Sequence, residues 1–213
     1  MKHLWKILAG CGCLSMIAGA ILLGAWFFTT RKPKVELEHY SNSRYGRSGK
    51  LAEHYVDFSF DYPKTWTIRT VDPDNINFVT VERSVDNKTW ENLNVSYYTP
   101  ATSTEDNERL YQQLFAQVEE QYQQQAHDFH KIYEGLEAAG HYPGHEALFT
   151  GTMETTSGPV QIYSRIIFVA KPGGEHGVAM TMMGTSFHPD LHEAKDLGRK
   201  GELPIVLDSF SFD

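Results

Sequence analysis

The chain has 213 residues, of which 41% are hydrophobic and 22% are charged. This composition is typical of a globular protein, so it excludes a disordered or collagen-like chain. The formal net charge is −8. Because binding to nucleic acid needs a surplus of Lys and Arg, this charge disfavours DNA or RNA as a partner, and we expect no nucleic acid to bind.

An uninterrupted apolar run occupies residues 7–28, after a short basic start. A helix of that length spans a lipid bilayer. Trp5 and Trp26 lie near its two ends, where aromatic side chains settle at the membrane interfaces. The sequence therefore predicts one N-terminal transmembrane helix, an anchor over residues 1–29 that contacts the lipid bilayer through residues 7–28.

Two other signals compete with an uncleaved anchor. The small residues 18–20 resemble the cleavage site of a signal peptide, and residues 8–11 resemble a lipobox whose Cys11 becomes acylated. Cleavage after Ala20 would leave the apolar sequence ILLGAWFF at the new N-terminus. The stretch before Cys11 is too short for a signal peptide. An uncleaved signal-anchor is therefore the favoured interpretation.

The orientation of this segment is not decided by charge, because basic residues flank it on both sides. Both cysteines of the chain, Cys11 and Cys13, lie within the apolar segment. A domain without cysteine is a mild indication of an exported setting, where free thiols are a liability. Long domains are also translocated with little regard to flanking charge. We therefore expect a single-pass membrane protein whose globular domain is extracytoplasmic, that is, periplasmic or extracellular.

Residues 30–53 mix charged residues, serine and glycine with little apolar periodicity, which predicts a polar linker. The globular domain is then expected over residues 54–213. It begins with residues 55–62, which largely alternate apolar and polar side chains and end at a proline, as a strand followed by a turn does. Two further β-rich runs, residues 76–81 and 93–98, predict a hairpin.

Residues 102–125 change to a helical period. Leu110, Leu114, Val118 and Tyr122 recur at four-residue steps opposite a polar side of Gln and Glu. Serine and threonine at the start of the stretch supply an N-cap. The pattern predicts an amphipathic helix whose apolar stripe packs on the domain's own sheet.

The remaining sequence predicts further strands and a second helix. Strands are expected at residues 129–133, 146–152, 160–170 and 177–185, separated by turns rich in glycine and proline. A short helix is expected within residues 189–207. Strands, a helix, a meander of strands and a second helix together predict an α+β domain, in which helices pack on the faces of a mostly antiparallel sheet.

Four features occur in a defined order: FSFDYPKTW at residues 58–66, the long helix after the first strands, GHEALFTG at residues 144–151 and LPIVLDSFSF at residues 203–212. In order and spacing they resemble the PsbP-like family, the fold shared by an extrinsic protein of photosystem II, a eukaryotic regulator of the Ran GTPase and many bacterial membrane-anchored or lipoprotein domains. The resemblance covers residues 54–213. It implies an α/β/α sandwich that binds proteins or assists assembly and is not an enzyme, since the family shares no catalytic residues.

No catalytic motif is present: the chain lacks a GxSxG elbow, a P-loop, a dinucleotide fingerprint and an HExxH zinc motif. The predicted domain has no cysteine, which excludes a thiol nucleophile or a cysteine-based zinc site there. A Ser-His-Asp triad stays open, since it is defined by geometry rather than by order in the sequence. We therefore predict no catalytic residues, no cofactor-binding residues and no cofactor.

Histidine is the one unusual feature, with pairs at positions 127 and 130, 141 and 145, and 188 and 192. Pro189 disfavours a helical metal clamp by the last pair. His141 and His145 flank a Tyr-Pro-Gly turn, where together with Glu146 they are the only, weak candidates for a metal site. No spacing matches a strong zinc pattern, so solvated surface histidines are the favoured interpretation and we expect no bound metal.

The favoured function is accordingly a membrane-tethered, extracytoplasmic protein-interaction or assembly module without enzymatic activity. It would bind an unidentified protein partner through an exposed sheet face or a set of loops. The alternative is a metal- or small-ligand-binding domain that uses the His-rich loops. A hydrolase ranks third.

Overall fold

The computed structural model describes residues 35–45, 47–70, 76–156 and 158–213. The predicted anchor, the competing cleavage site and the lipobox-like sequence all lie outside the described residues. Within these ranges no helix is both long and apolar enough to cross a membrane. The folded unit runs from Glu36 to Asp213.

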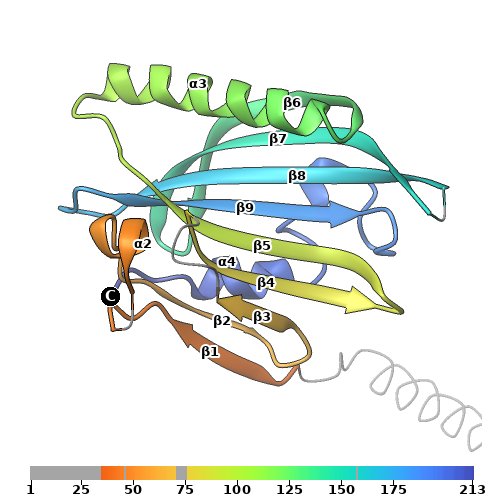
Figure 1. Cartoon of the computed structure of the whole chain (residues 1–213), viewed down its shortest axis with the longest axis horizontal. Helices are drawn as coiled ribbons and strands as arrows, with labels where there is room; N and C mark the ends of the chain where they lie inside the picture. The colour runs from red at the N-terminus through yellow and green to blue at the C-terminus, as the bar shows by residue number, and fades with distance from the viewer. Residues whose placement is uncertain (1–34, 46, 71–75, 157) are drawn as a thin grey trace, which may run out of the picture. The chain divides into compact units, whose positions relative to one another are not determined.

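A seven-stranded antiparallel sheet forms the centre of the folded unit (Figure 1). Its strands are β3 (Thr67–Thr70), β4 (Asn77–Val85), β5 (Lys88–Tyr98), β6 (His127–Ala139), β7 (Tyr142–Thr155), β8 (Gly158–Ala170) and β9 (Gly177–Thr185). Their order across the sheet is β3-β4-β5-β9-β8-β7-β6, so two meanders of consecutive strands meet where β5 pairs with β9. This confirms the predicted α+β class with a mostly antiparallel sheet.

The first strand of the folded unit lies in the segment expected to be a linker. β1 (Leu37–Ser41) pairs antiparallel with β2 (Ser59–Pro63) in a separate two-stranded sheet. The prediction of a linker over residues 30–53 is therefore wrong from Glu36 onward, and the globular domain starts earlier than predicted. Only Tyr40 is buried in β1, so this strand lacks the apolar alternation by which strands are recognised.

The segment between β1 and β2 is also ordered. It contains helix α2 (Gly49–Glu53), which buries Leu51. Of the strand predicted at residues 55–62, only the second half forms a strand, β2. Phe58 and Phe60 are fully buried, and their ring centroids lie 5.9 and 5.1 Å from that of Tyr40. This aromatic packing attaches the N-terminal part of the folded unit to its core.

β4 and β5 form the predicted hairpin, and both strands extend into the polar residues between the two predicted runs, 76–81 and 93–98. Asp86 and Asn87 make the tight turn, each with a positive φ, which a two-residue hairpin turn of type I′ requires. β6 likewise spans 13 residues instead of the five predicted at residues 129–133. Many of the added residues are exposed or half-buried, and their polar side chains obscure the period on which such predictions rest.

Helix α3 (Thr104–Gln123) confirms the amphipathic helix predicted over residues 102–125. It begins after Ser103, whose Oγ accepts a hydrogen bond from the backbone N–H of Asp106 at 3.1 Å. The helix lies along β6 and β7 on one face of the sheet (Figure 1). Phe115 is the fully buried residue of this helix, while the predicted stripe around it is only partly buried.

The opposite face of the sheet carries the C-terminal segment. The short helix expected within residues 189–207 is replaced by a 3₁₀ turn, η1 (Ala194–Asp196), and by helix α4 (Leu203–Ser209). After α4, the backbone of Ser211 exchanges two hydrogen bonds with that of Ser59, at 2.8 and 2.9 Å. Helices therefore cover both faces of the sheet, as predicted.

Candidate functional site

The weak metal candidates of the sequence do not meet in the structure. His145, on β7, places its Nε2 3.0 Å from Oε1 of Glu134 and stacks on the ring of Tyr111 under α3, with ring centroids 4.7 Å apart. Glu146 is 1% exposed, and its carboxylate accepts a hydrogen bond from Nε of Arg165 at 2.7 Å. His141 is exposed at the turn between β6 and β7.

The separation of these residues follows from strand geometry, since successive side chains of a strand point to opposite faces of the sheet. His145 and Glu146 are adjacent in β7, so they cannot share one ligand. Among the residues that the structure describes, no group of three or more His, Cys, Asp or Glu is arranged to hold a metal ion.

The prediction of solvated surface histidines is wrong for His188, which is 2% exposed. Its Nε2 lies 3.4 Å from Oε2 of Glu91 and 3.3 Å from Nη1 of Arg83, while its Nδ1 accepts the backbone N–H of Asp190 at 3.1 Å. Glu91 is fully buried. Arg83 also lies 3.5 Å from the carboxylate of Glu202. This buried charged cluster joins the sheet to the C-terminal segment.

Protonation in the buried charged cluster departs from ordinary values. Burial raises the pKa of Glu91 to about 7, and the nearby charge of Arg83 only partly opposes this rise. Burial and the charge of Arg83 lower the pKa of His188. Nδ1 of His188 accepts the backbone N–H of Asp190, and Nε2 faces both the guanidinium group of Arg83 and the carboxyl group of Glu91.

One sequence signal could have located this cluster. Glu91 shares the two-residue period of Leu93 and Val95, both of which are buried. A glutamate in phase with buried strand residues has to find a partner inside the protein. The histidine partner gave no such signal, because it lies in an irregular loop after β9.

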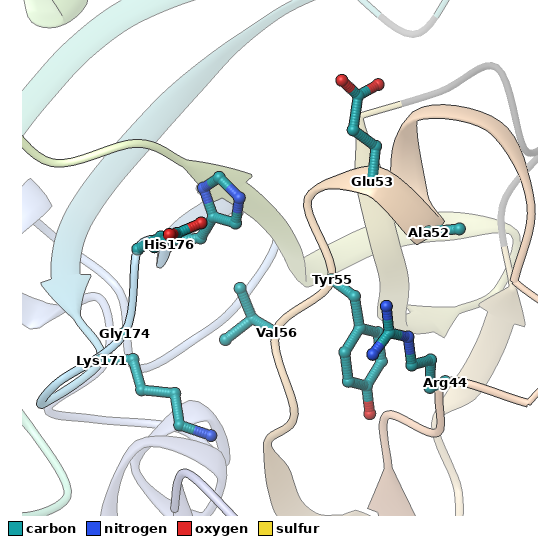
Figure 2. Close-up of a pocket in the computed structure, with 9 residues that line it drawn as sticks. Arg44, Ala52, Glu53, Tyr55, Val56, Lys171, Gly174 and His176 are labelled. Atoms are coloured by element: carbon teal, nitrogen blue, oxygen red, sulfur yellow. The ribbon is translucent and has the colours of Figure 1, made fainter.

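The pocket drawn in Figure 2 has a volume of about 220 Å³ and lies between the β8–β9 turn and the segment around α2. Lys171 and His176 come from the turn, and Arg44 lies over the ring of Tyr55 across from them. The ammonium group of Lys171 is already paired with the carboxylate of Asp57. The pocket therefore combines acidic and basic side chains, of which Lys171 is already in an ion pair, and its lining does not favour one class of ligand.

A more distinctive surface is the outer edge of β6. This strand ends the order of the seven-stranded sheet, so it pairs with β7 alone in the described part of the chain. Three apolar side chains on it are exposed: Ile132 at 49%, Tyr133 at 48% and Leu136 at 83%. The register with β7 is regular from Tyr133, opposite Leu148, to the end of the strand.

The first half of β6 differs from the second. Its register with β7 is interrupted between His127 and His130 and between Lys131 and Tyr133, so it contains bulges. Its Phe129 carbonyl accepts a hydrogen bond from Nε2 of Gln123 on α3 at 2.9 Å. Bulges and covering side chains protect an edge from further pairing. We name the regular half, Tyr133–Ala139, the open edge.

The carboxylates of the open edge are neutralised within the domain. Burial alone would raise the pKa of Glu134, but hydrogen bonds from Lys131 and His145 lower it. Burial would also raise the pKa of Glu137, but hydrogen bonds from Arg199 and from the backbone N–H of Ala138, together with the charge of Arg165, lower it. Each carboxylate thus has a cationic or hydrogen-bonding partner of its own.

A pocket of about 340 Å³ adjoins the open edge on the face that carries η1. Ile132, Tyr133 and Leu148 form its apolar part. The charged side chains at its rim form ion pairs with each other: Arg199 with Glu137, and Lys195 with Glu193, both at 2.8 Å. This side of the edge therefore favours uncharged groups.

No protein-family model matches this chain, and no curated protein is detectably similar to it in sequence. The fold nevertheless matches solved structures. The solution structure of cyanobacterial PsbP (CyanoP) from Synechocystis sp. PCC 6803 aligns with a TM-score of 0.56 and 12% identity, over 85% of this chain and 95% of that chain. The crystal structure of LpqN, involved in cell envelope biogenesis of Mycobacterium tuberculosis, aligns with a TM-score of 0.44 and 7% identity, over 83% and 91%. The comparison with CyanoP shows a PsbP-like fold.

Proposed function

We propose that this protein is a membrane-tethered, extracytoplasmic protein-interaction or assembly module without enzymatic activity, and that its binding surface is the open edge. The observation that carries the proposal is the regular edge of Tyr133–Ala139, which has no neighbouring strand on its outer side among the described residues and has Leu136 exposed at its centre. The PsbP-like fold and the apolar segment at residues 7–28 support the setting.

Backbone hydrogen bonding explains why a strand edge can bind another chain. An edge strand presents a row of unpaired N–H and C=O groups, which is a template for pairing with another chain. Natural proteins usually block such an edge with bulges, prolines or projecting charges. The first half of β6 shows such protection, whereas Tyr133–Ala139 is regular, contains no proline and carries only neutralised carboxylates. The open edge therefore lacks the features that usually block pairing with another chain.

Cross-linking in native membranes tests the surface. We expect the full chain to give discrete cross-linked adducts, and Leu136→Asp to abolish them, because a charge at the centre of the edge opposes pairing. Leu37→Asp is the matched control, since Leu37 is also an exposed strand leucine, at 47%. Adducts that survive Leu136→Asp, or that Leu37→Asp removes equally, would contradict this surface.

The tether is tested by fractionation. A transmembrane helix is held by the bilayer and not by charge, so the full chain is expected to stay with the membranes after carbonate or high-salt washing. Protease protection in sealed cells or vesicles then reports on which side the domain lies. Recovery of a soluble mature form that begins after Ala20 would support a cleaved signal peptide instead.

Small-ligand binding is the alternative function, and the pocket of Figure 2 is the place for it. His176 and Arg44 supply polar groups there, but the pairing of Lys171 with Asp57 reduces the charge available to a ligand. A saturable rise in Tm with a small carboxylate or phosphate, lost in Arg44→Ala, would favour this alternative.

A further inference from the structure

We propose that the open edge pairs with the same edge of a second copy of this chain, antiparallel and centred on Leu136. The inference rests on the proposed function and specifies its partner. The resulting contact is a two-fold symmetric one, in which the same surface patch of each copy is used. It would join the two seven-stranded sheets into one continuous sheet.

Symmetry restricts the possible registers. A two-fold axis perpendicular to the sheet places the α3 side of both copies on the same side of the joined sheet. Two residues that lie opposite each other across the axis must therefore have side chains that point to the same side. Because faces alternate along a strand, the axis has to pass through a residue position and not between two residues. Only Leu136 is the midpoint of the regular segment Tyr133–Ala139, so only this centre uses the whole open edge.

The register centred on Leu136 also gives favourable side-chain pairs. Leu136 faces Leu136 of the second copy, so two exposed leucines cover each other. Glu134 faces Ala138, Gly135 faces Glu137, and Tyr133 faces Ala139. Apart from the central pair of leucines, every large or charged side chain thus meets a small one, and no two carboxylates face each other.

Neighbouring registers are less favourable. A centre at Glu134 or at Glu137 places a glutamate directly opposite itself, and like charges in facing positions are destabilising. A centre at Gly135 shortens the regular pairing and sets Tyr133 against Glu137. The sequence of the edge therefore selects one register.

The charge of the chain does not prevent this contact. Although the formal net charge is −8, Glu137 is held by Arg165 and Arg199 at 2.6 and 2.8 Å. Glu134 accepts hydrogen bonds from Lys131 and His145. The carboxylates nearest the axis are thus neutralised within each copy before the copies meet.

Cysteine cross-linking tests the register. In the full chain with Cys11→Ser and Cys13→Ser, Leu136→Cys is expected to form a disulfide-linked dimer, because directly facing residues have Cα atoms about 4.5–5.5 Å apart. Ala138→Cys alone is the control: its two copies would be four residues apart along the ladder, about 13 Å, and should not link. A mixture of Glu134→Cys and Ala138→Cys chains should link again.

The native mass in mild detergent provides the second measurement. The full chain is expected to have the mass of a dimer, Leu136→Asp that of a monomer, and Leu37→Asp that of a dimer. A monomer at all concentrations, or equal linking by Leu136→Cys and Ala138→Cys, would overturn the proposal.

Failure of self-pairing can be told apart from failure of the proposed function. Membrane adducts that Leu136→Asp abolishes, but whose mass is not twice that of the chain, would overturn only the pairing of two copies. The open edge would then bind a different protein. Adducts that persist in Leu136→Asp would contradict the surface itself.

Discussion

Arg165, on β8, donates a hydrogen bond from Nη2 to the carboxylate of Glu137 on the edge strand β6 at 2.6 Å. Its Nε donates to Glu146 at 2.7 Å, and its Nη1 to the carbonyl oxygen of Leu197 at 3.0 Å. One buried guanidinium therefore connects an inner strand, the edge strand and the C-terminal segment. This connection orients Glu137 within the domain, where its Oε1 also accepts a hydrogen bond from the backbone N–H of Ala138 at 3.1 Å.

The first prediction concerns this guanidinium. Arg165→Leu removes the partner of Glu146, whose side chain is 2% exposed, and leaves an unpaired buried charge. We expect this to lower the free energy of unfolding by about 3–5 kcal/mol. Urea unfolding of the full chain in detergent measures it. Arg199→Leu is the control: its side chain is 55% exposed, so a loss below about 1 kcal/mol is expected. Equal losses for the two variants would contradict a special role of the buried pair.

The second prediction concerns Glu91 and pH. The folded-state pKa is about 7 and the reference value is 4.5, so the folded state holds this proton more tightly. The protonated carboxyl group of Glu91 therefore contributes to the free energy of unfolding. This contribution is fully present below about pH 4.5 and is lost as the pH rises through 7. Glu91→Gln removes the ionisation and should raise stability at pH 8, by up to about 3 kcal/mol, with a smaller or opposite effect at pH 5.

Thermal unfolding of the full chain between pH 5 and pH 8 measures this difference. The titratable and charged groups around Glu91 are Arg83, His188, Asp190 and Glu202, and they are unchanged in the variant. Glu154→Gln is the matched control, because Glu154 is exposed on β7. If the two variants show the same pH dependence, ionisation of the buried glutamate does not control stability.

The third prediction concerns the face of α3. Phe115 is fully buried against Phe149 and Phe168, so Phe115→Ala is expected to cost about 3–5 kcal/mol. Leu114 is only partly buried, so Leu114→Ala should cost less than about 2 kcal/mol. Denaturant unfolding compares the two. A larger loss for Leu114→Ala would mean that the helix packs through the predicted stripe and not through Phe115.

The fourth prediction concerns metal. His141, His145 and Glu146 lie apart in the structure, so micromolar zinc or manganese is not expected to raise the Tm. Calorimetry of the chain with and without metal measures this. A metal that binds the folded state raises Tm by mass action, and a saturable rise lost in the double variant His141→Ala, His145→Ala would establish a site there.

Periodicity in the sequence determined the elements whose apolar residues repeat regularly. The four-residue steps from Leu110 to Tyr122 located α3, and the β-rich runs on either side of Asp86 and Asn87 located the β4–β5 hairpin. The order of short motifs from Phe58 to Phe212 predicted the PsbP-like fold. These signals are local, because each depends on one face of one element being buried.

Tertiary structure decided the rest. β1 exists because β2 pairs with it, and its own side chains give no apolar alternation. His188 is buried because a loop after β9 folds over Glu91. The open edge became visible only from the strand order, since the sequence predicts that residues near 129–133 form a strand but not that this strand ends the sheet. Pairing, burial of loops and edge position depend on contacts between distant residues, and a local pattern does not encode them.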